Sequence, residues 1–145
     1  MRSLLSSWQL WAVLSAAFAA LTAIFAKVGV ENVGSDFATF IRTIVILAAA
    51  GAILGATGQW QPLNSVSPKS YVFLVLSGLA TGFSWLCYFR ALKLGDAARV
   101  APIDKLSVVL VAVFGAVFLG ETLALKNWTG VALIAAGAIL VALKP

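Results

Sequence analysis

The sequence predicts an all-α integral membrane protein with five transmembrane helices. Of its 145 residues, 62% are hydrophobic and only 10% are charged, and its mean hydropathy is +1.04. A soluble domain of this length is closer to half apolar and a quarter charged. Residues 8–26, 70–89 and 127–143 contain no charged side chain. Each of these segments comes close to the roughly 20 apolar residues that a spanning helix needs.

The first two helices are expected at residues 8–27 and 37–57, separated by a link that contains Gly29 and Gly34. Glycine interrupts a helical pattern because its backbone has so much conformational freedom. A signal peptide is an alternative for the first segment, since Ala17 and Ala19 have the spacing of the two small residues at a cleavage site. The uncharged stretch is longer than the usual apolar core of a signal peptide, so a spanning helix is favoured.

The three remaining helices are expected at residues 70–92, 98–119 and 127–143. Pro62 and Pro68 should keep the link before the third helix non-helical. Pro102 is expected in the first turn of the fourth helix, where its missing N–H costs no hydrogen bond. The uncharged part of that helix, about 15 residues, rises only about 22 Å, whereas the hydrocarbon core is about 30 Å thick. The helix must therefore recruit Asp104 and Lys105, which places both inside the membrane or at its edge.

The composition argues against several classes of function. The chain has no histidine and a single cysteine, Cys87. A metal site, a catalytic Cys–His pair and a Ser–His–Asp triad all need residues that are missing here. The sequence therefore predicts no enzyme, no catalytic residue and no cofactor. The net charge of +5 fits the basic flanks of a membrane protein, and the scattered basic residues do not indicate nucleic-acid binding.

Charged residues within the predicted spans are the first candidates for a functional site, because a charge in the membrane usually faces a cavity or a partner. The candidates, all expected toward one side of the membrane, are Lys27, Arg42, Arg90, Asp104 and Lys105. Lys27 and Arg90 can instead reach the interface with their long side chains, so they are secondary candidates. Arg42 and Asp104 are expected either to act on a solute or to form buried ion pairs. Asp104 could also interact with the positive end of its helix dipole.

Two stripes of residues add to these candidates. Lys105 shares a helical face with Ala112 and Ala116, which predicts that it points into the protein. On the third helix, a polar stripe runs beside an aromatic one, and together they supply Thr81, Ser84, Trp85 and Tyr88. Hydroxyls beside aromatic rings suit a small polar solute with an apolar part. Hydrogen bonding between helices explains the hydroxyls equally well.

Small residues at four-residue spacing allow helices to approach closely in lipid. Gly51 and Gly55 have this spacing in the second helix, and Gly78 and Gly82 have it in the third. On the fourth helix Ala112, Ala116 and Gly120 have the same spacing, and Gly130 and Gly137 share one face of the fifth. These residues indicate either packing within one chain or a seam between two copies, which is expected on the fourth or fifth helix.

A longer stretch resembles a known family. "RVAPIDKLSVVLVAVFGAVFLGETL" followed by "GVALIAAGAILV" is similar to the closing half of an EamA domain of the drug/metabolite transporter superfamily. The shared features are Pro102 at the start of the fourth helix, the "FLGE" that ends at Glu121, and a fifth helix rich in Gly and Ala. "SWLCYFRALKLGDAARVAPIDKLS" resembles the single-domain, five-helix bacterial members in particular.

The resemblance implies a solute carrier of the bacterial plasma (inner) membrane, built from inverted five-helix units. Most members carry two such units in one chain, and this chain carries one. No acidic residue precedes Glu31, so the proton-coupled cation exchange that the small multidrug resistance branch centres on a helix-one glutamate is not expected.

Together these features predict a small-solute transporter subunit that acts as a homodimer by alternating access, because alternating access needs two units around a midplane site. The excess of cations among the candidate residues favours a small anionic or zwitterionic metabolite. The alternative is a non-transporting accessory subunit that stabilises a partner membrane protein. Self-association in detergent separates the two, since an accessory subunit would need its partner.

The distribution of basic residues predicts the orientation only weakly. Basic residues prefer the cytoplasmic side. One side would carry Arg2, Lys69 and Lys126, and the other Lys27, Arg90, Lys93, Arg99 and Lys144. The C-terminal side is therefore expected inside. Because the bias is small, an antiparallel homodimer is favoured over a parallel one.

Overall fold

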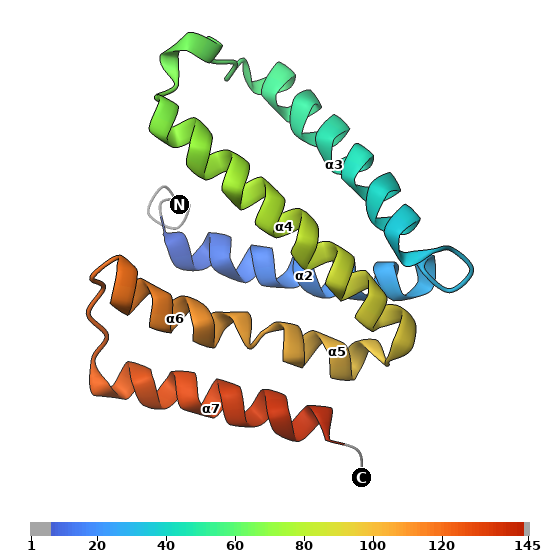
Figure 1. Ribbon diagram of the computed structural model, residues 1–145, viewed down its shortest axis with the longest axis vertical. Coiled ribbons are helices and arrows are strands. Elements are labelled where there is room, and N and C mark those ends of the chain that lie inside the picture. Colours follow the sequence, from blue (N-terminus) through green and yellow to red (C-terminus); the bar gives the residue numbers. More distant parts are fainter. Residues whose placement is uncertain (1–6, 144–145) are drawn as a thin grey trace. The chain divides into compact units, whose positions relative to one another are not determined.

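The computed structural model describes residues 7–143, and within them five segments are long and apolar enough to cross a membrane. In chain order the elements are α2 (Trp8–Gly29), α3 (Ser35–Thr57), η1 (Leu63–Ser65), α4 (Pro68–Leu94), α5 (Ala97–Asp104), α6 (Ser107–Phe118) and α7 (Leu125–Ala142) (Figure 1). No strand occurs in the described residues. The predictions of an all-α membrane fold and of five spans are confirmed. Arg2 and Lys144, which entered the orientation count, lie outside the described residues.

The chain divides into two compact units, and each is described by itself. The first is formed by residues 26–93 and contains the end of α2, then α3, η1 and α4. The second is formed by residues 7–25 and 94–143 and contains most of α2 together with α5, α6 and α7. The expectation of a single domain at residues 1–145 therefore stays a prediction.

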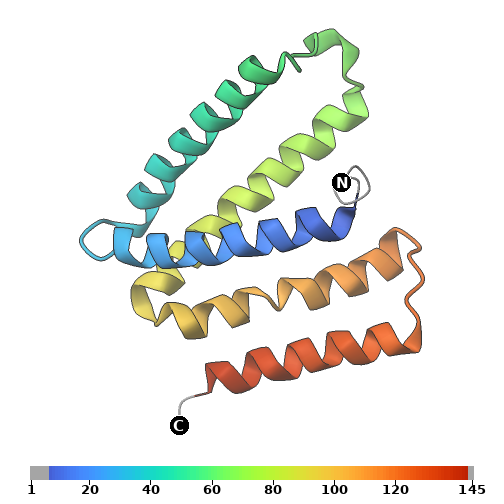
Figure 2. The ribbon, with the colours of Figure 1, turned by 180° about the vertical axis from the view of Figure 1, so that it is seen from behind.

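In the first unit, α3 and α4 run in opposite directions and are joined by the link that contains η1 (Figures 1 and 2). Helix α3 ends at Gly58, which has φ 64° and donates its N–H to the Leu54 carbonyl. Such a left-handed position suits glycine because it has no Cβ. The Tyr71 hydroxyl donates to the Leu63 carbonyl at 2.6 Å, which fastens the link onto α4.

The start of α4 differs from the expectation. Pro68, expected in the link, is the first residue of α4. Proline is tolerated there because the first amides of a helix have no partner within the helix. The Ser67 hydroxyl accepts a hydrogen bond from the Ser70 amide at 3.1 Å, as the residue before a helix commonly does.

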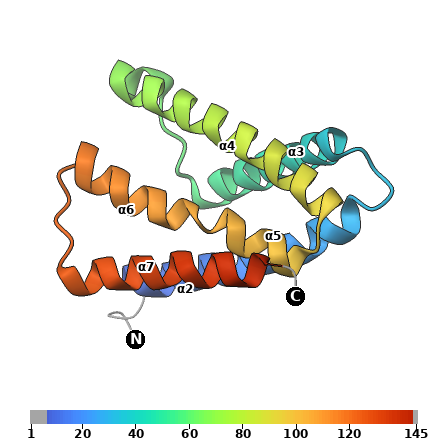
Figure 3. The ribbon, with the colours of Figure 1, turned by 60° about the horizontal axis from the view of Figure 1, so that its bottom comes forward.

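In the second unit, α7 lies beside α5 and α6 (Figure 3). The Arg99 guanidinium of α5 donates to the carbonyl of Ala142, the last residue of α7, at 2.6 Å. A cation at the carboxyl end of a helix binds carbonyls that have no partner within the helix. Gly120, with φ 68°, provides the turn that follows α6.

The fourth span is divided into two helices, where a single helix over residues 98–119 was expected. Pro102 lies inside α5, which begins at Ala97, so its predicted place in the first turn is wrong. An interior proline cannot donate to the carbonyl four residues back, and its ring collides with that carbonyl. Beyond it, the amides of Leu106 and Val108 bond the carbonyls of residues only three positions back, Ile103 and Lys105, both at 3.0 Å. The helix resumes at Ser107.

Candidate functional site

The feature that stands out in the first unit is a cation held over aromatic rings. The Arg42 guanidinium of α3 lies 4.1 Å from the centroid of the Trp85 ring and 5.4 Å from that of the Phe89 ring, both on α4. Phe89 is buried, whereas Arg42 and Trp85 are half-buried. A cation over an aromatic face is attracted by the negative face of the ring. We call Arg42, Trp85 and Phe89 the arginine clamp.

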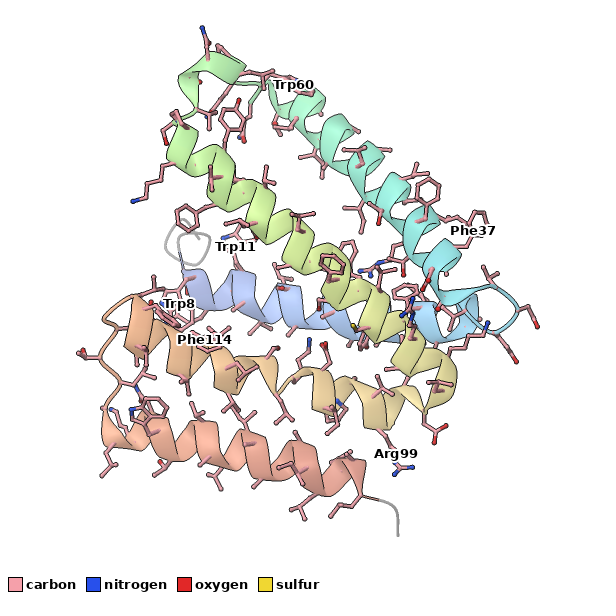
Figure 4. The ribbon with its side chains drawn as sticks, viewed as in Figure 1. Trp8, Trp11, Phe37, Trp60, Arg99 and Phe114 are labelled. Atoms are coloured by element: carbon pink, nitrogen blue, oxygen red, sulfur yellow. The ribbon has the colours of Figure 1, made fainter. Side chains whose placement is uncertain are left out.

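The arginine clamp lies inside the spanning part of α3. Arg42 follows Ser35, the first residue of α3, by two helical turns, which corresponds to about 10 Å along the axis. Figure 4 marks the two ends of this span with Phe37 near the start of α3 and Trp60 just beyond its end. The sequence placed Arg42 within its helix and Trp85 and Tyr88 on the next one, and the structure brings these elements together.

The second arginine of this unit is engaged differently. Arg90 donates from Nη2 to Asp36 Oδ2 at 2.8 Å and from Nε to Asp36 Oδ1 at 3.1 Å. This two-point contact matches the planar guanidinium to the planar carboxylate. Arg90 had been expected to extend to the interface, and Asp36 was not among the candidates. The sequence could have indicated this pair, because Asp36 lies near the start of α3 and Arg90 near the end of the adjacent antiparallel α4. The two residues are 54 positions apart in the chain, so the pairing was not recognised.

Two lysines join the same end of this unit. Lys27 Nζ donates to the Leu92 carbonyl near the end of α4 at 2.7 Å. Lys93 Nζ donates to the carbonyl of Val33, in the link between α2 and α3, at 2.8 Å. Carbonyls at the carboxyl end of a helix attract cations. Lys27, a secondary candidate, thus has a structural role in fixing the end of α4.

The polar stripe of α4 is only partly associated with the arginine clamp. Tyr88 is half-buried and lies within electrostatic range of Arg42. The Thr81 hydroxyl donates to the Ser77 carbonyl of its own helix at 2.9 Å. Thr81 and Ser84 are exposed. Trp85 and Tyr88 are therefore the members of the stripe that the structure connects with Arg42.

Asp104 and Lys105 belong to the second unit, at the break between α5 and α6. Lys105 Nζ and Asp104 Oδ2 are 3.2 Å apart, and the two side chains are 55% and 33% exposed, respectively. Asp104 is the last residue of α5, so the explanation that places it in a first helical turn is wrong. Because the helix is interrupted after Lys105, this lysine also does not head one continuous stripe with Ala112 and Ala116. Its cation instead complements the carbonyl end of α5.

Glu121 closes the turn after α6. Its amide donates to the Gly115 carbonyl at 3.0 Å. Its carboxylate folds back over Gly115, so a Cβ added there would lie 2.6 Å from Oε2. Gly115 is buried, and glycine leaves the space that this carboxylate occupies. Among the described residues, no group of three or more His, Cys, Asp or Glu side chains is arranged to hold a metal ion.

Residues 6–143 match the EamA-like transporter family. The chain belongs to this family. An EamA assignment over almost the whole sequence confirms the resemblance seen in the Pro102 and Glu121 segments. It identifies a multi-pass membrane protein of a transporter family, consistent with the bacterial inner membrane.

Two relatives extend the comparison. The EamA chain is 69% identical over 136 residues to a Sinorhizobium sp. protein described as an uncharacterized transporter in the cobO 3' region, covering 94% of this chain and 96% of that protein. It is 24% identical over 90 residues to the probable 4-amino-4-deoxy-L-arabinose-phosphoundecaprenol flippase subunit ArnE of Proteus mirabilis (strain HI4320), covering 61% of this chain and 80% of that protein. No solved structure matches the chain.

Proposed function

We propose that this EamA-family chain is a small-solute transporter subunit that acts as a homodimer by alternating access. The observation that carries the proposal is the arginine clamp, a cation well inside a spanning helix and held by aromatic rings. Ionisable side chains within membrane spans are costly, and they commonly mark the path of a substrate or ion. The substrate is a small anionic or zwitterionic metabolite, because the cation of Arg42 would attract a negative group.

The proposed binding or coupling residues fall into two groups, each within its own unit. Arg42, Trp85 and Tyr88 supply a cation and aromatic surface, with Thr81 and Ser84 farther along α4. Asp104 and Lys105 lie where the fourth span is interrupted. Irregular backbone at membrane depth is tolerated where it is buried in protein or lines a water-filled cavity. Broken spans frequently hold substrates or coupling ions in transporters.

The homodimer follows from the size of the unit. Transporters of this type are built from repeated units, with the binding site at the repeat interface. A chain with a single five-helix unit would need a second copy to complete such an interface. An antiparallel pair would reproduce an inverted repeat, which is why we favour it over a parallel pair.

A second candidate is an accessory subunit that stabilises a partner membrane protein without transporting a solute itself. It is favoured by one observation, the description of the Proteus mirabilis relative as a subunit of a flippase. Such a role would require a different protein in the complex, whereas the homodimer requires only this chain.

The two candidates differ in purified material. The chain alone, solubilised in a mild detergent, should migrate as a dimer in light scattering, and proteoliposomes containing only this chain should accumulate or release labelled organic anions. A monomer that transports nothing would contradict the homodimeric transporter. A library of carboxylates, phosphates and zwitterions screened by thermal shift would identify solutes for the transport assay.

A further inference from the structure

The two arginines of the first unit hold their charges in contrasting ways. Arg90 has its Nε and Nη2 donors occupied by the two carboxylate oxygens of Asp36. Arg42 is held over the rings of Trp85 and Phe89. Within residues 7–143 the ion pairs are Arg90–Asp36 and Lys105–Asp104, so Arg42 has no carboxylate partner there. One guanidinium is therefore already neutralised, and the other is not.

The contacts of Arg42 within residues 7–143 are with aromatic rings, and they leave its hydrogen-bond donors unfilled there. A guanidinium has five N–H donors in one plane and no acceptor. Aromatic rings attract its charge, but they do not provide the in-plane oxygen acceptors that these donors match. The rings also restrict the side chain, which reduces the entropy that a ligand must offset when it binds to the guanidinium.

The neighbouring side chains of α3 do not supply an anion. The hydroxyls of Thr39 and Thr43 lie one turn before Arg42 and next to it, and they donate to the carbonyls of Ser35 and Thr39 at 2.9 Å and 2.8 Å. Both hydroxyl protons are thus used within the helix. Since no carboxylate pairs with Arg42 within residues 7–143, a ligand is the partner that we consider for its charge, and the low dielectric of the membrane interior would strengthen the attraction.

We infer that the arginine clamp is the recognition site for an organic oxyanion, a carboxylate or a phosphate attached to an apolar body. The oxyanion accepts hydrogen bonds from Arg42, and the apolar body lies against the aromatic side chains of α4. This inference rests on the proposed transport function and specifies its substrate class. The same chemistry could come from a soluble metabolite or from a lipid-borne phosphate.

The test measures binding to the purified full chain in nanodiscs by calorimetry. The soluble probes are phenyl phosphate and benzoate, with inorganic phosphate and benzyltrimethylammonium as comparison ligands. Wild-type chain should bind at least one aromatic anion more tightly than it binds either comparison ligand. Arg42→Gln should weaken binding by about ten-fold or more, and Arg42→Lys, which keeps the charge but loses the planar set of donors, should weaken it by a smaller factor.

Lys69→Gln is the matched control, since it removes one positive charge from the first unit at an exposed position. It should leave binding unchanged. Equal affinity of wild type and Arg42→Gln for the aromatic anions would overturn the inference, as would a preference for benzyltrimethylammonium or for inorganic phosphate.

A second experiment, with nanodiscs of different lipid composition, distinguishes a soluble anion from a lipid phosphate as the natural ligand. Nanodiscs that contain phosphatidic acid should block phenyl phosphate binding, relative to phosphatidylcholine nanodiscs, if the natural ligand is a lipid phosphate. Unaltered binding in both assigns the site to a soluble anion. Binding that depends on Arg42 supports the inference in either case. If neither the soluble probes nor the lipid binds in an Arg42-dependent way, the inference is refuted.

A measurement on wild-type protein covers the case in which Arg42 variants do not fold. Phenylglyoxal modifies arginine side chains, and mass spectrometry locates the modified residues. Phenyl phosphate should protect Arg42 from modification while leaving Arg99 unaffected, because Arg99 is engaged by the Ala142 carbonyl in the second unit. Absence of protection would contradict the inference. Arg42-dependent binding in a chain that fails to transport would contradict the transport proposal and leave the oxyanion site intact.

Discussion

Asp104 and Lys105 are neighbours in the chain, and their side chains interact at 3.2 Å while remaining partly exposed. Ion pairs with this much exposure contribute at most about 1 kcal/mol to stability. We therefore expect Asp104→Asn to change the free energy of unfolding by less than about 1 kcal/mol. If the carboxylate at the break serves transport, uptake should nevertheless fall about ten-fold or more. Thermal unfolding and proteoliposome uptake measure the two effects.

Asp96→Asn is the matched control for this change. Asp96 precedes the first residue of α5, and its side chain makes no capping hydrogen bond. Uptake by this variant should equal that of the wild type. Normal uptake by Asp104→Asn would show that the Asp104 carboxylate is not needed for transport.

Gly115 and Glu121 form a second contact that can be tested at single residues. An alanine Cβ at position 115 would lie 2.6 Å from Glu121 Oε2, so Gly115→Ala must displace the carboxylate. That carboxylate is the far end of a flexible side chain and can swing away, so we expect Gly115→Ala to stabilise the wild-type chain less than the helix propensity of alanine alone would give. In a Glu121→Ala background the collision is gone, and the same substitution should stabilise α6 by up to about 1 kcal/mol because alanine is the better helix former. Unfolding free energies of the four proteins in a double-mutant cycle measure the coupling. Equal effects of Gly115→Ala in the two backgrounds would show that the carboxylate does not rest on Gly115.

At the scale of the elements, the division of the fourth span can be tested at Pro102, which lies inside α5 shortly before the turn at residues 105–106. Pro102→Ala restores the amide that can donate to the Ala98 carbonyl, and it removes the ring that collides with that carbonyl. We expect a more continuous helix and a gain in stability of up to about 3 kcal/mol. If the break serves transport, uptake should fall in the same variant. Thermal unfolding and uptake would again be measured together.

Pro68→Ala controls for the loss of a proline. Pro68 is the first residue of α4, where the amide has no partner within the helix, so neither stability nor uptake should change much. A Pro102→Ala variant that is stabilised and transports normally would show that the break is dispensable.

The sequence predicts the spans well because hydrophobicity over about 20 residues directly reflects the thickness of the bilayer. It predicts the ends of the helices less well because those depend on individual capping contacts. The Ser67 hydroxyl on the Ser70 amide starts α4 at Pro68, earlier than the apolar run suggests. Likewise, the start of α5 at Ala97 places Pro102 in the helix interior, where a proline is costly, and not in the first turn.

The candidate site was predicted only in part, because the sequence indicates single residues but not the contacts between helices. Arg42 and Trp85 could be singled out individually, because each is unusual or suggestive within its own helix. The Asp36–Arg90 pair could not, because it depends on how α3 and α4 are aligned along each other. Hydrophobic periodicity specifies which residues share a helical face, but it does not specify which turn of one helix meets which turn of the next.

At the scale of the whole molecule, the small residues of α3 bear on the assembly. An added Cβ at Gly51 or Gly55 would meet no atom within 4 Å. The spacing of these glycines permits close approach by another helix, and in lipid such approach supplies van der Waals contacts. A second copy of the chain is the partner that the proposed homodimer provides.

The orientation of the two copies can be decided with single cysteines at Asn32 and Asn64 in a Cys87→Ala background. These residues lie in the links at the opposite ends of α3, so they mark opposite sides of the membrane. Basic side chains are only slightly more numerous toward the Asn32 end, and a weak bias permits insertion in both directions. We therefore expect each cysteine to react with an impermeant maleimide from both sides. Labelling of each site from one side alone would establish a single orientation and exclude the antiparallel homodimer.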